Sequence, residues 1–479
     1  MSYISGVSRD QIVLFPEAMD DYISPENPVR FIDAFVEKIN LSKQGFKKSI
    51  PAKTGRPAYN PKALLKLYIY GYKNRITSSR RLEVETHRNM EVIWLLRKLR
   101  PDFKTIADFR KENALAFKAV FREFTLLCRT LNLFSAELIA IDGTKIKAVN
   151  SSSRNYSKKR LEKSLKEINE RIDDYLKIID QSDEKEAEIT TLNVFELQEA
   201  IKSLEKKKGS AQEMIQQMKE TGETQISLTD PDSRSFPRKF GVRVGYNAQS
   251  AVDSKHHLIV EQDVSNAVTD IDQLSAMAIK SKEALGLEKL VVVADAGYCN
   301  ATEIQTCEDE DIETYVPKTN TSISTKQGLF GKEQFTYDTE KNRYICPVGK
   351  YLPYRFEGKE KRRDKIKHVL YYVGESCQSC EQKARCTKSK DPRRITRCPE
   401  EGAIDRMQVR MQQHPEIMKK RKAIVEHPFG TIKFWNHQNA FLMKGLEKVR
   451  AEFSLSTLAY NMKRVIKIVG VKKMIEALA

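Results

Sequence analysis

The sequence lacks any apolar run approaching the roughly 20 residues that a membrane-spanning helix requires. Its first residues, MSYISGVSRDQ, also lack the apolar core of a secretory signal peptide. These two absences predict a cytoplasmic protein with no membrane partner. The eight cysteines are then expected to be reduced or metal-bound, because disulfides are rare where thiols are kept reduced.

Acidic residues are scarce relative to basic ones. The chain has 83 Lys and Arg against 65 Asp and Glu, which gives a formal net charge of +18 and a pI near 9.3. Such a balance favours a polyanionic partner, with binding that weakens as salt rises. Charge alone is equally compatible with a ribosomal or membrane-surface protein. At 479 residues the chain is too long for one ordinary core, and about two to four folded units are expected.

Two aspartates follow short apolar runs that are typical of buried strands. Asp142 follows residues 138–141 and Asp295 follows residues 290–294, and both runs are rich in β-branched residues. A carboxylate at the end of a buried strand is costly unless it is hydrogen-bonded, paired or bound to a cation. A turn or a helix N-cap would explain either aspartate taken alone.

A third carboxylate, Glu426, lies in the basic stretch KKRKAIVEHPFGTIK. The segment from Met418 to Lys433 predicts a helix that kinks or ends just past Glu426, at Pro428. Taken alone, Glu426 would be half of an exposed ion pair.

Together the three carboxylates predict a metal site. Mg2+ takes oxygen ligands and leaves room for substrate phosphates. Two such ions about 3.5–4 Å apart can activate the attacking oxygen and stabilise the leaving one. We therefore expect phosphoryl transfer on a nucleic acid, with two Mg2+ or Mn2+ ions at Asp142, Asp295 and Glu426.

Four other aspartates, Asp253, Asp263, Asp270 and Asp272, compete for the metal role. A turn explains Asp253, and capping of the following helix explains Asp270. All four are assigned to structure and not to metal binding.

The first 128 residues predict helices. Residues 61–70 open with Pro in the first turn and carry apolar residues at helical spacing. A second helix that begins near Ser78 presents Arg80 and Arg81. Short helices with a basic face suit a helix-turn-helix-like DNA reader. The alternative is a helical packing or dimerisation module.

Residues 157–224 interrupt the strand pattern. Leu161, Leu165, Ile168 and Ile172 are spaced four and three residues apart, and a similar stripe follows a polar stretch at residues 181–186. This pattern predicts two helices in an antiparallel hairpin. Packing of one helix on the other is the expected use of the stripe, and subunit pairing is an additional one.

A basic and irregular section contains a second candidate metal site. Cys377 and Cys380 form a CxxC pair, and Cys346 and Cys386 supply two more thiols, which suits tetrahedral Zn2+. The gap after Cys346 is long, and Cys398 could replace one of the four. A bound zinc would be structural, holding together an insertion that lacks a large core. Reduced thiols without metal are the alternative.

Several stretches of the chain resemble the bacterial insertion-sequence transposases of the DDE type. They are IDGTKIKAVNS, VGYNAQSAVDSKHHLIVEQDV, VVVADAGY and RKAIVEHPFGTIK, and the resemblance extends from GRPAYNPKALLKLYIYGY to AEFSLSTLAYNMKRV. It implies an α/β fold with an RNase H-like mixed sheet flanked by helices. It also implies that Asp142, Asp295 and Glu426 are the catalytic, metal-binding triad.

The resemblance further implies that Arg421 and Lys433 flank the Glu and face DNA phosphates. This chain departs from the family pattern at Met418, where many relatives have a Tyr. The side chains expected to contact DNA, from this segment and from the amino-terminal helices, are Arg421, Lys422, Lys433, Arg80 and Arg81.

The expected organisation has four parts. They are a helical DNA-binding domain (1–128), an RNase H-like core (129–156, 225–320 and 405–479), a helical-hairpin insertion (157–224) and a Cys-containing insertion (321–404). The resemblance implies a transposase that cuts double-stranded DNA at the terminal inverted repeats of its own element and joins the freed 3′-hydroxyl to target DNA. A homodimer or higher assembly is expected, because two DNA ends must be joined. The alternatives are an RNase H-like nuclease that does not join DNA and a non-catalytic DNA-binding regulator or inactive transposase.

Overall fold

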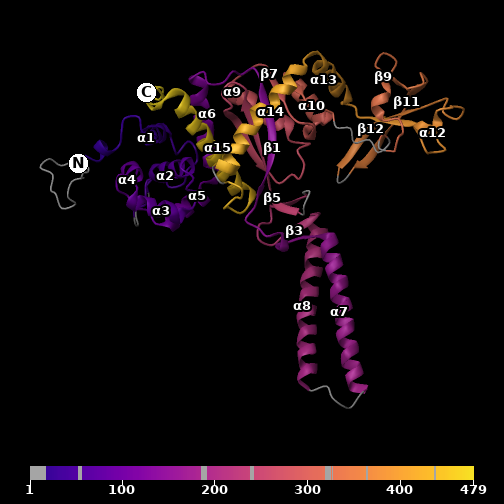
Figure 1. Ribbon diagram of the computed structural model, residues 1–479, viewed down its shortest axis with the longest axis horizontal. Helices are drawn as coiled ribbons and strands as arrows, with labels where there is room; N and C mark the ends of the chain where they lie inside the picture. The colour runs from indigo at the N-terminus through magenta and orange to yellow at the C-terminus, as the bar shows by residue number, and fades with distance from the viewer. Residues whose placement is uncertain are drawn as a thin grey trace, which may run out of the picture.

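The computed structural model describes residues 18–479 except 52–56, 185–190, 238–241, 319–324, 326, 363–364 and 436–437. A mixed sheet lies at the centre of the molecule, with the amino-terminal helices on one side of it and a smaller sheet on the other (Figure 1). A long helical hairpin projects away from this body. The predicted α/β class with an amino-terminal helical region is confirmed.

The central sheet is built around β1 (Ile139–Lys147). This strand pairs antiparallel with β5 (Val242–Asp253) and parallel with β7 (Leu290–Val293). The strand order is β4-β5-β1-β7-β8, and β6 also pairs with β5. The remaining strands are β4 (Arg234–Pro237), β6 (Ile259–Ser265) and β8 (Ile312–Tyr315). An antiparallel meander of β1, β5 and β6 followed by parallel β7 and β8 is the sheet expected for an RNase H-like core.

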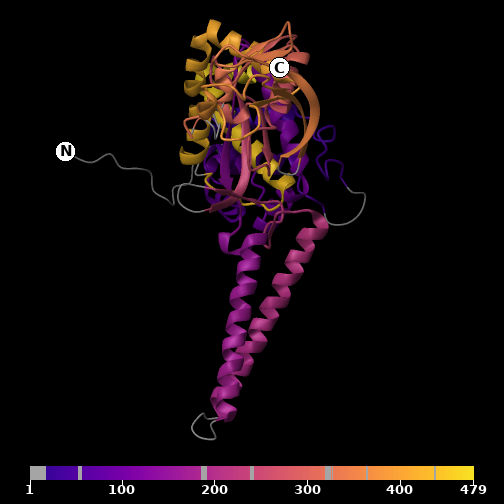
Figure 2. The same ribbon diagram turned by 90° about the vertical axis from the view of Figure 1, so that its right-hand side faces the viewer.

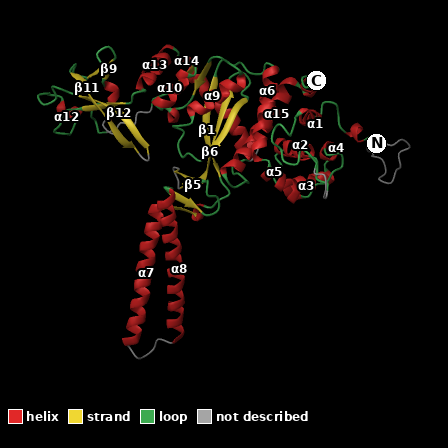
Figure 3. Cartoon of the chain, turned by 180° about the vertical axis from the view of Figure 1, so that it is seen from behind, coloured by secondary structure: helices red, strands yellow, loops and turns green. Residues whose placement is uncertain are grey.

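Helix α15 (Leu446–Val469) joins the central sheet to the amino-terminal helices. It contacts β6 on one side and α2 and α6 on the other, and every residue from Ala451 to Met462 is buried. A helix buried all round belongs to the core rather than to the surface. The other helices of the core region are α9 (Leu274–Leu285), α10 (Ala301–Asp309), α13 (Glu401–Gln413) and α14 (Pro415–Gly430), seen from behind in Figure 3.

Helices α2 and α3 begin where the sequence predicts. Asn60 caps α2 (Pro61–Lys73) by accepting a hydrogen bond from the Lys62 amide, and Pro61 occupies the first turn. The others are α1 (Pro28–Lys38), α3 (Ser79–Arg88), α4 (Met90–Leu95), α5 (Phe103–Glu112) and α6 (Ala114–Thr130). The last helix of the chain, α16 (Val471–Glu476), packs against α1.

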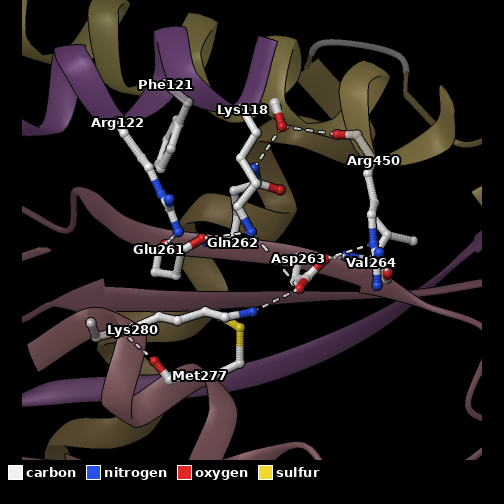
Figure 4. Close-up of polar contacts among 12 residues, drawn as sticks. Lys118, Phe121, Arg122, Glu261, Gln262, Asp263, Val264, Met277, Lys280 and Arg450 are labelled. Carbon is white, nitrogen blue, oxygen red and sulfur yellow. Dashed lines mark hydrogen bonds and ion pairs between the residues drawn. The ribbon is translucent and has the colours of Figure 1, made fainter. Parts of the chain in front are cut away.

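Two carboxylates of β6 form ion pairs with the helices that pack around the sheet (Figure 4). Glu261 Oε1 lies 3.2 Å from Lys118 Nζ and Glu261 Oε2 lies 3.7 Å from Arg122 Nη2, and both cations are on α6. Asp263 lies 3.3 Å from Lys280 of α9 and 2.9 Å from Arg450 of α15. The paired cations explain why Asp263 is structural, as the sequence predicts.

We expect Asp263→Asn to lower the free energy of unfolding by about 2 kcal/mol at pH 7, because it removes the acceptor of several charged donors. Burial alone would raise the pKa of Asp263, but Lys118, Arg450 and Lys280 outweigh burial and hold the pKa below its ordinary value. A carboxylate whose pKa is lowered on folding stabilises the folded protein at pH values above its ordinary pKa of about 4. This stabilisation disappears as the pH falls through the pKa of the folded state.

Urea unfolding of both proteins at pH 7 and pH 3 measures this effect. The difference in the free energy of unfolding between wild type and Asp263→Asn should be smaller at pH 3 than at pH 7. The control Asp311→Asn, at an exposed position, should change this free energy little at either pH. A difference that is equal at both pH values would contradict the assignment.

The helical hairpin consists of α7 (Lys158–Glu184) and α8 (Thr191–Thr221). At its base, β2 (Asn155–Ser157) pairs with β3 (Gln225–Ser227). Leu161 packs on Ala211 and Met218 across the pair, and the two helices extend well beyond the body in perpendicular views (Figures 1 and 2).

Within the described residues no helix is both long and apolar enough to cross a membrane.

The Cys-containing section forms a second sheet, so the expectation of an irregular insertion is wrong. Its antiparallel strands follow the order β13-β12-β11-β10-β9. They are β9 (Thr336–Asp338), β10 (Arg343–Ile345), β11 (Tyr351–Arg362), β12 (Lys365–Val373) and β13 (Arg394–Arg397). Aromatic and β-branched residues favour strands, and Tyr344, Tyr372 and Ile395 are buried in the small core of this sheet.

Candidate active site

The register of the central sheet places Asp142 and Asp295 side by side. Ala140 lies opposite Val293 in the parallel β1–β7 pair, so two residues further along each strand Asp142 comes level with Asp295. Asp295 follows β7, as expected. Asp142 does not end its strand, because pairing with β5 continues β1 to Lys147. Strand pairing, rather than local sequence, determines where β1 stops.

Asp295 also caps a short turn. Its Oδ1 accepts a hydrogen bond of 2.8 Å from the Gly297 amide, at the start of the 3-10 turn Ala296–Tyr298. The N-cap interpretation of this residue is therefore correct. Capping and metal binding are compatible, because a carboxylate has several lone pairs.

The carboxyl group of Asp142 is held in an environment that disfavours its negative charge. Burial, together with the charges of Asp295 and Asp270, raises its pKa to about 6, against the lowering effects of the Gly143 amide and Arg421. Three carboxylates near one another in a half-buried site favour an additional positive charge between them.

Helix α14 and the turn that follows it bring two cations to β1. Arg421 Nη1 lies 3.8 Å from Asp142 Oδ2 and is buried, with no hydrogen-bond partner among the described residues. Lys433, in the π-helical turn Thr431–Trp435 that follows α14, donates hydrogen bonds to Thr144 Oγ1 and to the Lys145 carbonyl at 3.3 Å. Two cations therefore lie beside the strand that carries Asp142.

Glu426 is not gathered with the two aspartates. Its side chain is 65% exposed, and Lys422 Nζ lies 3.8 Å from its Oε1. Among the described residues, no three His, Cys, Asp or Glu side chains converge closely enough to hold a metal ion. Helix α14 turns Ile424 and Val425 toward the core, and Glu426, on the next position, faces outward.

The sequence predicts a kink or a helix end at Pro428, and the helix end is wrong. Helix α14 includes Pro428 and ends at Gly430, after which the chain continues as a π-helical turn. Pro428 has no N–H group to donate to the preceding turn of the helix.

The remaining predicted DNA-contacting residues are exposed. Lys422 is 76% exposed, and Arg80 and Arg81 lie on the exposed side of α3. Arg80 stacks its guanidinium 5.2 Å from the centre of the Phe103 ring. These side chains are accessible to a partner, but they lie on the helices α3 and α14 and not on the strands that carry the two aspartates.

Asp270 is the residue that sequence reasoning missed. The expected helix cap is wrong, because α9 begins at Leu274 and is capped at Gln273 without a side-chain bond. Asp270 Oδ1 instead accepts hydrogen bonds from Lys145 (3.0 Å), Asn247 (2.6 Å) and Gln249 (2.8 Å).

This network lies directly beside Asp142. Gly143 is opposite Gln249 in the β1–β5 pair, and the side chain of Gln249 also accepts a hydrogen bond from the buried Tyr298 hydroxyl. A side chain added at Gly143 would meet Gln249, Asp270 and Tyr298. The signal in the sequence was the spacing of Asn247 and Gln249, since residues two apart on a strand share a face.

The four predicted zinc ligands lie together, apart from the central sheet. Cys346, Cys377, Cys380 and Cys386 line one cavity of about 30 Å3 in the smaller sheet. Burial raises the pKa of Cys386, and the other three thiols add to that rise. Cys398 lines a different cleft, beside Cys299, so the alternative assignment of Cys398 to the cluster is wrong.

Comparison with protein families gives two matches in this chain. Residues 17–112 match a transposase domain (DUF772), and residues 345–466 match a transposase DDE domain. The first match covers most of the amino-terminal helices. The second covers β11, β12 and β13 of the smaller sheet, Arg421, Glu426 and most of α15. Asp142 and Asp295 lie outside both matched ranges.

Comparison with solved structures gives a similarity to a piggyBac transposase in a synaptic complex with hairpin DNA. The identity is 9%, the TM-score is 0.32, and the alignment covers 95% of this chain and 79% of that one. A search of curated proteins finds no match.

Proposed function

Because this chain is an insertion-sequence DDE transposase, we propose that Asp142 and Asp295 are the carboxylates at which it cuts DNA. The observation that carries the proposal is the parallel pairing of β1 and β7, which brings the two aspartates level. Beside Asp142 lies a buried guanidinium N–H group of Arg421 that has no hydrogen-bond partner among the described residues. That N–H group is suited to donate a hydrogen bond to a phosphate oxygen of DNA.

Divalent cations, Mg2+ or Mn2+, are the proposed cofactors, held by Asp142 and Asp295 with Glu426 as the third ligand. The donor set fits, since these ions prefer carboxylate oxygens, and the raised pKa of Asp142 supports a need for positive charge at this point. When bound, two such ions activate the attacking oxygen and stabilise the leaving oxygen of the phosphodiester. Glu426 must turn inward to take part.

Cations of the chain hold the DNA backbone in this proposal. Arg421 and Lys433 position the phosphate at the aspartates, and Lys422 extends the basic surface of α14. Arg80 and Arg81 of α3 contact the terminal repeats. Phosphate contacts of this kind position the duplex without reading its sequence. Two copies of the chain are proposed to act together, because two DNA ends must be joined.

A cleavage and joining assay tests the proposal. A labelled duplex that carries the end of the element is incubated with the protein and Mg2+ or Mn2+. Metal-dependent nicking followed by strand transfer is the expected result. Cutting without joining would indicate a nuclease instead, and specific binding without cutting would indicate a non-catalytic DNA-binding protein.

We expect Asp270→Asn to lower the cleavage rate about 10- to 100-fold, as loss of a group that orients metal ligands does. The amide would place a donor among the donors of Lys145, Asn247 and Gln249, which disturbs the strand that carries Asp142. Asp270 is thus a positioning residue.

The readout is the cleavage rate as a function of metal concentration, with thermal unfolding measured in parallel. A shift to higher metal concentration is the signature of a disturbed site, which a loss of stability alone would not produce. Asp272→Asn, two residues along the same loop, should stay within about twofold of wild type, since its carboxylate bonds Asn300 instead. An unchanged metal dependence in Asp270→Asn would rule out the positioning role.

A further inference from the structure

Four cysteines from three separate segments meet in the smaller sheet. Cys346 lies in the turn between β10 and β11, Cys377 and Cys380 lie in the loop after β12, and Cys386 ends the short helix α12 (Lys383–Cys386). All four are half-buried and line the same cavity of about 30 Å3. A cavity of this size admits a single ion and excludes an organic cofactor.

The backbone around these cysteines is shaped to support sulfur ligands. The Lys350 amide donates a hydrogen bond of 3.3 Å to Cys346 Sγ, in a turn closed by Gly349 at a φ of +78°. Gly374 lies so close to Cys377 Sγ that an added Cβ would collide with the sulfur. An N–H donor stabilises a thiolate over a thiol, and the left-handed turn favours glycine.

The smaller sheet has too little apolar core to hold its strands by burial alone. Its fully buried apolar cluster consists of Phe335, Tyr344, Leu352, Tyr372 and Ile395. Small folded units with so few core residues usually need a metal or disulfides. Cys346, Cys377, Cys380 and Cys386 form no disulfide within the part of the chain that the structure describes, which leaves a metal as the remaining device.

We propose that Cys346, Cys377, Cys380 and Cys386 bind one structural Zn2+. Four sulfur ligands select Zn2+ or iron and disfavour Mg2+ or Mn2+, and a site closed by four thiolates leaves no position for a substrate. In the part of the chain that the structure describes, the four sulfur atoms are not close enough together to hold an ion. Binding therefore requires the cysteine side chains to rotate toward the ion. This site is independent of the proposed aspartate centre.

Metal analysis of the purified full-length protein tests the proposal. About one zinc per chain is expected after growth with zinc, and about none in the double variant Cys377→Ser/Cys380→Ser. Cobalt substitution should give the absorption of a tetrahedral thiolate complex in wild type only. Cys299→Ser and Cys398→Ser, which change thiols of the separate cleft, should keep the zinc.

Hydrogen exchange provides a second measurement on the wild-type protein. Removal of zinc by a chelator should increase exchange in residues 336–397 and leave the central sheet unchanged, because metal binding is coupled to local folding. Wild-type protein without zinc, zinc retained by the double variant, or iron in place of zinc would each overturn the proposal.

Discussion

Asp142→Asn is expected to abolish DNA cleavage and to leave DNA affinity within about twofold of wild type. The variant is nearly isosteric but loses the negative charge at the centre of the aspartate pair. If the carboxylate holds a divalent ion, its loss removes several kcal/mol of transition-state stabilisation, which corresponds to a rate at least about 10^3-fold lower. The affinity should persist, because the cations of α3 and α14 are untouched.

Cleavage of the element-end duplex and binding of the same duplex, measured at fixed salt, separate these two effects. Asp311→Asn is a matched control, because Asp311 is exposed. Asp311 precedes β8 and Asp295 follows the parallel strand β7, so the two residues lie at opposite ends of these strands. The control should cleave at the wild-type rate. Cleavage by Asp142→Asn at a wild-type rate would refute the assignment of the catalytic pair.

Glu426→Gln is expected to lower cleavage at least about 100-fold without weakening the fold. Glu426 is exposed and pairs only loosely with Lys422, so its removal from the free protein should cost little stability. A large loss of activity would therefore arise in the complex with metal and DNA, where the carboxylate turns toward Asp142 and Asp295.

Glu416→Gln is the control for this change, because Glu416 is an exposed Glu on the same helix. Cleavage rates, unfolding curves and DNA affinity should be wild-type for Glu416→Gln. If Glu426→Gln also cleaved like wild type, Glu426 would not be the third ligand. Asp270, whose charge already acts on Asp142, would then be the next residue to test in that role.

The sequence alone determined the strands and helices that position the site. The apolar runs before Asp142 and Asp295 correctly predicted β1 and β7, because a short run rich in β-branched residues has few other stable uses. Pro61 predicted the start of α2, because its fixed φ suits the first helical turn. The heptad-like spacing after Ser157 likewise predicted α7 and α8. In each case the information is carried by residues close together in the chain.

Only the tertiary structure decided which side chains meet. The aspartates come level because β1 and β7 pair in one register out of several, and the sequence of either strand does not specify that register. Asp270 looked like a helix cap, but its acceptors are satisfied by Lys145, Asn247 and Gln249, which strand pairing brings within reach. Glu426 looked like a partner of the aspartates, but in the free protein the burial of Ile424 and Val425 leaves the Glu426 side chain facing outward. Local sequence sets secondary structure, whereas contacts between distant segments depend on how whole elements bury their apolar faces.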